Sequence, residues 1–179
     1  MSQYDTEGLH KDRPGTISTF YGRIDPLHPD PAEVDIRDIA HSLARLCRYN
    51  GHVGGFYTVA RHSLIVSWHL EYTGYPDLAL QGLLHDGAEA YLSDIPRPVK
   101  RAPELEHFRE FDAAMNKAVM EHFGLPYPIP EEVMDADRYV LLELELPSPN
   151  GLRYTWHGDY VTDEYDFLAR YDYLNGLYS

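Results

Sequence analysis

From about residue 35 onward, apolar residues recur at helical spacing in segments that glycine and proline separate. This pattern limits the fold more than any other feature of the chain, because residues three and four apart share one face of a helix. The first segment runs from Asp35 to about Tyr49, and Asp35 and Asp38 favour its N-terminal end by capping and through the helix dipole. Further helices are predicted over residues 58–72, 76–92, 105–123, 131–146 and 164–174.

The remaining segments carry strand, turn and loop signals. Residues 17–21 and the segment after Gly22 are predicted to form a short β-hairpin, and residues 151–157 an extended segment. Residues 94–100 follow the third helix and are expected to form a loop. We therefore predict an all-α fold, a single helical bundle with a short N-terminal β-hairpin, in which residues 1–16 form a flexible arm and residues 17–179 one domain.

The net charge and the composition exclude several classes of protein. With a net charge of −14, the chain repels nucleic-acid backbones, so we expect no nucleic-acid polymer as a partner. The sequence contains no apolar run long enough to span a membrane, and its N-terminus lacks the pattern of a signal peptide. Cys47 is the only cysteine, which indicates a reducing compartment. We expect a cytoplasmic protein that is not bound to a membrane.

His85, Asp86 and Glu89 form the most informative group of polar residues. Glu89 lies four residues after His85 and three after Asp86, so all three crowd one face of the predicted helix. The helix around them is very apolar, and buried ionisable groups need each other or a cation to offset their desolvation. A divalent metal meets this need, since imidazole and carboxylate are its usual ligands. A buried, hydrogen-bonded polar cluster without a metal is the alternative.

Adjacent histidine and aspartate on one helix cannot enclose a metal alone, so other helices must supply ligands. His62, on the preceding predicted helix, is the best candidate. Asp135 and Asp137 compete for a further position, and Asp137 is favoured because its place before the apolar run 139–142 directs it inward. The predicted ligands of one divalent transition metal (zinc, cobalt, manganese, iron or nickel) are therefore His62, His85, Asp86 and Asp137.

An ordered set of motifs resembles the HD-domain metal-dependent phosphohydrolase superfamily. A single histidine, a His-Asp pair and a distant aspartate stand at His62, His85-Asp86 and Asp137. The chain is similar in particular to the 5′-deoxynucleotidases and the phage dATP triphosphohydrolases. The motifs that carry this likeness span about residues 36–146 and are Cys47-Arg48-Tyr49, Ala60-Arg61-His62-Ser63, His85-Asp86-Gly87-Ala88-Glu89, Asp94-Ile95-Pro96-Arg97-Pro98-Val99-Lys100 and Asp135-Ala136-Asp137.

The resemblance implies a hydrolase in which one metal and a water molecule act at the α-phosphorus of a nucleotide. Glu89 would orient this water or shuttle a proton, and Asp94 would contact the sugar hydroxyl or assist the same water. Arg48 and Lys100 would hold phosphate, which suits the bidentate and the point-charge character of these side chains. Tyr49 stands where tryptophan is common among these relatives, which implies a role in stacking on the base. The resemblance also points to a homo-oligomer.

The sequence leaves the substrate and its products open. The small-molecule nucleotide would be a deoxynucleoside monophosphate, cut to nucleoside and phosphate, or a triphosphate such as dATP, cut to nucleoside and triphosphate. Both reactions cut the same 5′-phosphoester, and Arg61, Arg97, Lys100 and Arg101 could hold the outer phosphates of the longer substrate. A second hypothesis is hydrolysis of a cyclic nucleotide or guanosine tetraphosphate. Members of the superfamily that bind two metals usually carry further histidines near the His-Asp pair, and none stands at the obvious positions here, which disfavours this hypothesis. A third is a metal-stabilised regulatory module without turnover. A relative without catalysis would be expected to have lost Glu89, so its presence disfavours this hypothesis.

Overall fold

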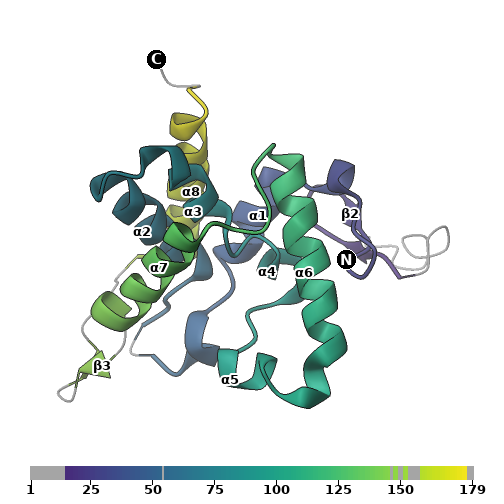
Figure 1. Cartoon of the computed structure of the whole chain (residues 1–179), viewed down its shortest axis with the longest axis horizontal. Helices are drawn as coiled ribbons and strands as arrows, with labels where there is room; N and C mark the ends of the chain where they lie inside the picture. The colour runs from purple at the N-terminus through teal and green to yellow at the C-terminus, as the bar shows by residue number, and fades with distance from the viewer. Residues whose placement is uncertain (1–14, 54, 146, 149–150, 153–157, 177–179) are drawn as a thin grey trace, which may run out of the picture.

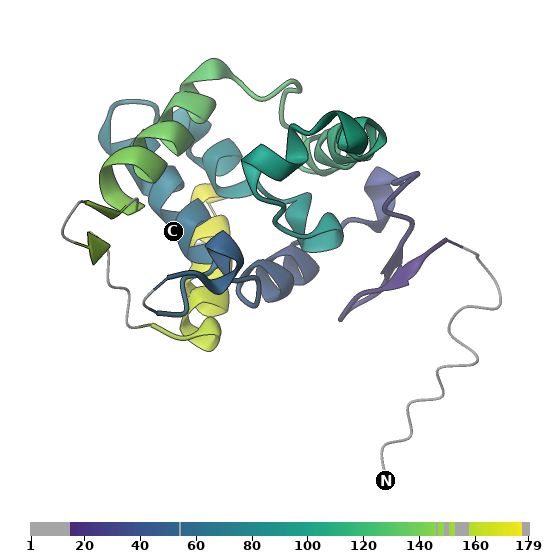
Figure 2. The ribbon, with the colours of Figure 1, turned by 90° about the horizontal axis from the view of Figure 1, so that it is seen from below.

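The structure of the chain, a computed structural model, describes residues 15–53, 55–145, 147–148, 151–152 and 158–176 (Figures 1 and 2). The predicted flexible arm lies outside the described residues except at 15 and 16, and most of the predicted extended segment 151–157 lies outside them as well. Helices make up most of the described chain, and an antiparallel hairpin precedes them. The prediction of an all-α fold with a short β-hairpin is confirmed.

The helices and strands follow one another in an order that matches most of the predicted segments. The predicted helices 58–72 and 105–123 are confirmed as α2 (Val59–Tyr72) and α6 (Glu106–His122), and the predicted helix 164–174 forms part of α8 (Tyr160–Leu174), which begins four residues earlier than expected. The predicted helix 131–146 is confirmed over its described residues as α7 (Glu131–Tyr139) and the π-helical segment η5 (Val140–Glu145). The elements η1 to η4 are 3₁₀ turns. The elements are β1 (Ile17–Ser18), β2 (Arg23–Ile24), η1 (Pro31–Glu33), α1 (Ile36–Leu43), η2 (Arg48–Gly51), α2 (Val59–Tyr72), η3 (Pro76–Leu78), α3 (Ala79–Leu84), α4 (Glu89–Leu92), α5 (Arg97–Lys100), η4 (Pro103–Leu105), α6 (Glu106–His122), α7 (Glu131–Tyr139), η5 (Val140–Glu145), β3 (Pro147–Ser148), β4 (Gly151–Leu152) and α8 (Tyr160–Leu174).

The first helix is shorter than predicted, since it ends at Leu43 and not near Tyr49. The backbone N–H of Arg48 donates to the carbonyl of Tyr57, so the chain after α1 pairs with the segment that leads into α2 instead of extending the helix. In the turn η2, Tyr49 adopts a φ of 58°, in the left-handed region. This turn directs residues 48 and 49 toward the interior side of the fold, where the candidate site lies.

The predicted helix 76–92 is interrupted between α3 and α4. The backbone N–H of Gly87 donates to the carbonyl of Leu84, and that of Glu89 to the carbonyl of Asp86, three residues back rather than four. The predicted loop 94–100 is also wrong in its second half, where α5 forms one helical turn. Proline is tolerated there because the first N–H groups of a helix have no partner within it.

Helix α2 lies at the centre of the fold, in contact with α3, α7 and α8. Its closest neighbour is α3, and a Cβ atom added at Gly82 would collide with the side chain of Leu70, so glycine permits the close approach of these helices. A large hydrophobic core joins α1, α2, α3, α4, α6 and α8, and a smaller one, which includes Val66, Val133 and Val140, joins α2 to α7.

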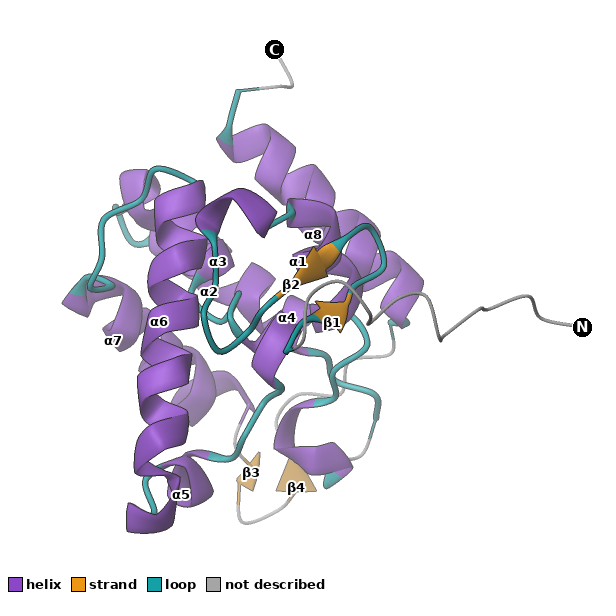
Figure 3. Ribbon diagram, turned by 90° about the vertical axis from the view of Figure 1, so that its right-hand side faces the viewer, coloured by secondary structure: helices purple, strands orange, loops and turns teal. Residues whose placement is uncertain are grey.

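Helices α6 and α7 stand on opposite sides of the view in Figure 1, with α5 near the base between them. Figure 3 shows α5 at one end of the long helix α6. Within the described ranges, no helix combines the length and the apolar character that a membrane span requires.

Candidate metal centre and adjoining cleft

Two histidines from different segments of the chain meet in the interior. His62 lies in α2 and is fully buried, and His85 follows α3 directly and is 5% exposed. Their ring centroids lie 5.2 Å apart. The start of α2 is held by Thr58, whose side chain accepts from the backbone N–H of Arg61. The close packing of α2 on α3 therefore brings the two imidazoles together.

Each imidazole has one nitrogen bound by a buried acceptor. His62 Nδ1 lies 2.6 Å from Oε1 of Glu145, and His85 Nδ1 lies 2.8 Å from the carbonyl oxygen of Gly82. Carbonyl and carboxylate oxygens only accept hydrogen bonds, so Nδ1 donates in both residues. Each Nε2 atom is buried, and neither makes a hydrogen bond to a described residue. Two ring nitrogens are thus left without a hydrogen bond beside the carboxylates of Asp86 and Asp137.

Two carboxylates adjoin these nitrogens. Asp86 Oδ2 lies 3.2 Å from His85 Nε2 and 3.7 Å from His62 Nε2. Asp137 Oδ1 lies 3.1 Å from His62 Nε2 and 3.9 Å from His85 Nε2. His62, His85 and Asp86 offer ligand atoms within 4.8 Å of one another, so these three residues could hold a metal ion. Imidazole nitrogens without partners, next to carboxylates, fit the donor set of a divalent transition metal.

The structure places Asp137 with the other three predicted ligands. Asp137 is 6% exposed and faces the histidines, whereas Asp135 lies on the outer face of α7 and pairs with Arg138 at 3.0 Å. Two positions along a helix change the direction of a side chain by about 200°. This rotation directs Asp137 toward the histidines and Asp135 away from them, so Asp137 is the one of the two candidates that lies in the cluster.

The cluster attracts positive charge. Burial opposes ionisation of Asp86 and Asp137, but the adjacent histidines hold the pKa of both carboxyls well below the usual range. For His85, burial also opposes the charge, yet Asp86 and Asp137 raise its pKa well above the usual value. Similarly, His62 and then Arg48 lower the pKa of Glu145 to about 2 against the effect of burial. Protons on the imidazoles and a divalent cation would therefore compete for this cluster.

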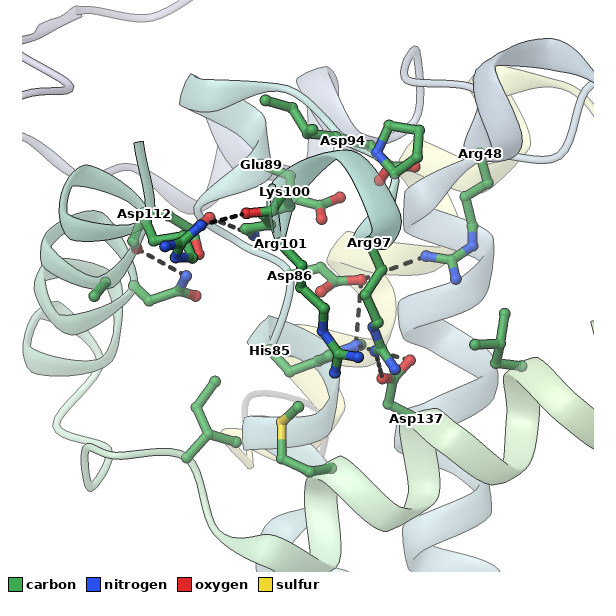
Figure 4. A pocket seen from close by; sticks show the side chains of 18 of the residues that line it. Arg48, His85, Asp86, Glu89, Asp94, Arg97, Lys100, Arg101, Asp112 and Asp137 are labelled. Atoms are coloured by element: carbon green, nitrogen blue, oxygen red, sulfur yellow. Dashed lines mark hydrogen bonds and ion pairs between the residues drawn. The ribbon is translucent and has the colours of Figure 1, made fainter. Parts of the chain in front are cut away.

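The cluster opens onto a cleft of about 750 Å³ (Figure 4). The chain carries a net charge of −14, yet basic and acidic side chains line the cleft in equal number. An anionic ligand therefore meets a more favourable field in the cleft than over the surface as a whole. The basic residues are Arg48, Arg97, Lys100, Arg101 and Arg109, and the acidic residues are Asp86, Glu89, Asp94, Asp112 and Asp137.

Glu89 and Asp94 lie on one wall of the cleft, on α4 and on the loop after it. Burial, with the negative charges of Asp86 and Asp94, raises the pKa of Glu89 well above its usual range. Burial also raises the pKa of Asp94. Oε2 of Glu89 is buried without a hydrogen bond to any residue the structure describes. A carboxyl group with a raised pKa can exchange protons closer to neutral pH, as acid–base chemistry requires.

Arg48 and Tyr49, the predicted substrate contacts, both line the cleft. Arg48 Nη1 lies 3.5 Å from Asp86 Oδ2, and its Nε lies 3.4 Å from Glu145 Oε2. The Tyr49 hydroxyl donates to Glu145 Oε2 at 2.7 Å. The turn η2 is therefore tied to the metal cluster through two carboxylates.

The basic residues of α5 cover the other side of the cleft. Arg97 Nη2 lies 3.1 Å from Asp137 Oδ2, and Lys100 Nζ lies 2.6 Å from Asp112 Oδ1. Arg101, the residue directly after α5, also lines the cleft (Figure 4).

Arg61 does not take part in this cleft, contrary to the expectation that it holds outer phosphates. Its guanidinium is buried against α8, where Nη2 lies 2.6 Å from Asp163 Oδ1 and 2.7 Å from Asp166 Oδ2. These carboxylates neutralise the guanidinium, and none of the three residues lines the cleft. The charge of Arg61 therefore serves the packing of α8 on α2.

Glu145 and Tyr57 belong to the site, and the sequence did not identify them. The Tyr57 hydroxyl donates to Glu145 Oε1 at 2.5 Å, next to the bond with His62. Glu145 is the last residue of the largely apolar segment η5. A carboxylate in an apolar helix needs a partner, so the argument that was applied to Glu89 also applies to Glu145. Tyr57 carries no such signal.

The comparisons with known proteins identify relatives of this chain. No protein-family model matches the sequence. The uncharacterized protein YfdR of Escherichia coli is 34% identical over 128 residues, which cover 70% of this chain and 67% of that protein. An uncharacterized protein of Rhodobacter capsulatus is 39% identical over 120 residues, which cover 64% of this chain and 60% of that protein.

Proposed function

The chain belongs to the family of the uncharacterized Escherichia coli protein YfdR, and we propose that it is a metal-dependent phosphohydrolase of the HD type that acts on deoxynucleotides. The proposed reaction is hydrolysis of the 5′-phosphoester at the α-phosphorus, with one divalent transition metal as cofactor. The motifs around His62, His85-Asp86 and Asp137 support the nucleotide substrate, and the geometry of the cluster supports the metal.

One observation carries the proposal: the Nε2 atoms of His62 and His85 lie beside Asp86 and Asp137 without hydrogen bonds to described residues. Of these four residues, His85, Asp86 and Asp137 line the cleft. A buried cluster that only stabilises the fold satisfies its hydrogen bonds internally. The four side chains come from three separate segments and leave two ligand nitrogens free, which suits a metal that a substrate can reach.

The residues around the cluster are suited to hydrolysis of a phosphoester. When bound, a divalent metal lowers the pKa of a coordinated water molecule and polarises a phosphoryl oxygen. Glu89 would accept the proton of the attacking water and return it to the 5′-oxygen as the bond from phosphorus to that oxygen breaks. Arg48 would orient the phosphate, Asp94 the sugar hydroxyl, and the ring of Tyr49 the base.

The basic residues on α5 and directly after it favour a triphosphate over a monophosphate. A monophosphate needs few cations beyond the metal and Arg48, whereas Arg97, Lys100 and Arg101 extend the basic lining along the cleft. Outer phosphates would exchange the Asp137 contact of Arg97 for a contact with substrate. The product would then be a nucleoside and intact triphosphate.

Product analysis tests this function with metal-supplemented full-length protein and a panel of dNMPs, NMPs and dNTPs. We expect nucleoside and triphosphate from dNTPs; inorganic phosphate from monophosphates would instead mark a 5′-nucleotidase. Asp86→Ala should abolish turnover, whereas Asp135→Ala, which alters an exposed aspartate, should not. An active Asp86→Ala variant, or no product with any divalent metal, contradicts the proposal.

Two outcomes would redirect the assignment. Turnover of cyclic nucleotides or guanosine tetraphosphate alone would support the second hydrolase hypothesis, and metal binding without any turnover would support a regulatory module. The expected homo-oligomer and cytoplasmic location stay predictions, which sedimentation analysis and cell fractionation test.

A further inference from the structure

Glu145 has the most enclosed carboxylate in contact with a predicted metal ligand. Its side chain is 1% exposed, and both of its oxygens accept hydrogen bonds. Oε1 accepts from the Tyr57 hydroxyl at 2.5 Å and from His62 Nδ1 at 2.6 Å. Oε2 accepts from the Tyr49 hydroxyl at 2.7 Å, and Arg48 Nε lies 3.4 Å from it. A carboxylate held from four directions cannot turn away from the imidazole.

The π-helical segment η5 accounts for the position of Glu145. Glu145 follows Asp137 by eight residues, and in a regular α-helix this separation turns a side chain by about 80° from the first. The wider turn of a π-helix rotates the chain less per residue, which returns Glu145 toward the face of Asp137. Such π-helical turns are rare and occur frequently at functional sites. The π-helical turn therefore lets one helical segment carry both Asp137, a predicted ligand, and Glu145, which lies behind the predicted ligand His62.

We propose that Glu145 is a positioning residue that orients His62 for metal binding; this inference rests on the proposed metal site. By accepting from Nδ1, Glu145 directs the lone pair of Nε2 toward Asp86 and Asp137. Its negative charge stabilises the tautomer with the proton on Nδ1, as carboxylates behind ligand histidines do in other metal sites. Loss of that charge weakens metal binding although no ligand is removed.

Asp163 provides a matched control. It is also a fully buried carboxylate that contacts α2, accepting from the Thr58 hydroxyl at 2.6 Å and from Arg61 Nε at 2.8 Å. None of the groups bonded to Asp163 is a predicted metal ligand. Substitution of Asp163 therefore perturbs a buried polar network beside the same helix without altering the orientation of His62.

The test compares Zn²⁺ affinity of full-length wild type, Glu145→Gln and Asp163→Asn, measured by competition with a chromophoric chelator at fixed pH. Glu145→Gln should bind zinc about 10- to 100-fold more weakly than wild type. Asp163→Asn should lower the unfolding midpoint and leave the zinc affinity of the folded protein unchanged. Wild-type affinity in folded Glu145→Gln, or an equal loss in Asp163→Asn, overturns the proposal.

A second measurement does not require the variant to fold. In ¹⁵N-histidine-labelled wild type with zinc, His62 should give the spectrum of an imidazole protonated at Nδ1 and bound through Nε2. A His62 that lacks the Nδ1 proton overturns the proposal. Both readouts are independent of turnover, so a chain that binds zinc but hydrolyses no nucleotide contradicts the proposed function without contradicting the role of Glu145.

Discussion

The guanidinium of Arg97 lies 3.1 Å from Oδ2 of Asp137, and Oδ1 of the same carboxylate lies 3.1 Å from His62 Nε2. Asp137 therefore connects the buried metal cluster to a basic side chain that is 49% exposed in the cleft. The Asp137 end of this ion pair is buried, but half of the Arg97 side chain is exposed in the cleft, where an incoming phosphate can reach it.

Arg97→Ala should raise the KM for a dNTP by about 10- to 100-fold, because a hydrogen bond to a charged group contributes roughly 1.5–3 kcal/mol. Zinc affinity should not fall, since the substitution removes a positive charge beside a ligand. Steady-state kinetics and chelator competition measure the two effects. Arg138→Ala is the control, because Arg138 pairs with Asp135 outside the cleft. Equal KM values for Arg97→Ala and wild type would remove Arg97 from the substrate site.

Zinc should stabilise the folded chain, because only the folded state brings His62, His85, Asp86 and Asp137 together. At a free zinc concentration about 100 times the Kd, the free energy of unfolding should rise by about 2.7 kcal/mol. Urea denaturation with zinc and with EDTA measures the difference. His62→Ala should lose this response, and His122→Gln, which alters an exposed histidine on α6, should keep it. An identical midpoint with zinc and with EDTA in wild type would argue against the site.

The stabilisation by zinc should grow as the pH rises from about 6 to about 8. In the metal-free fold, Asp86 and Asp137 raise the pKa of His85 against the opposing effect of burial, while the unfolded imidazole keeps a pKa of about 6.5. A raised pKa in the folded state gives stability that is complete below the unfolded pKa and is lost as the pH rises through the folded pKa. The affinity for zinc rises over the same pH range, because protons compete less with the metal for His85 as the pH rises. Urea titrations at several pH values, with zinc and with EDTA, should show the gap widening; a narrowing gap contradicts the assignment of His85 as a ligand.

Glu89→Gln should lower kcat by about 10²- to 10⁴-fold, the usual contribution of a general acid–base group. Its zinc affinity should not decrease, since Glu89 is not one of the four predicted metal ligands. The matched control is Glu121→Gln, an exposed glutamate on α6. Wild-type kcat in Glu89→Gln would exclude Glu89 as the proton-transfer group, and loss of zinc would instead make it part of the metal site.

Much of the helical framework could be predicted, because its signals are local. The capping aspartate at Asp35 and the apolar spacing after Thr58 act within one or two helical turns, and α1 and α2 begin where these signals lie. The end of α1 could not be predicted in the same way. It depends on the pairing of Arg48 with Tyr57 and on the left-handed backbone of Tyr49, both of which require the two segments to meet.

By itself, the sequence determined which residue types form the candidate metal centre and their order along the chain, because the chemistry of metal ligands restricts these types and helical spacing restricts their face. Only the tertiary structure decided how the charges are paired. It turned Arg61 toward α8, set Arg97 on Asp137, and placed Glu145 behind His62 through a π-helical turn. Electrostatic pairing depends on distances of a few ångströms between segments far apart in the chain, and periodicity within one segment carries no information about those distances.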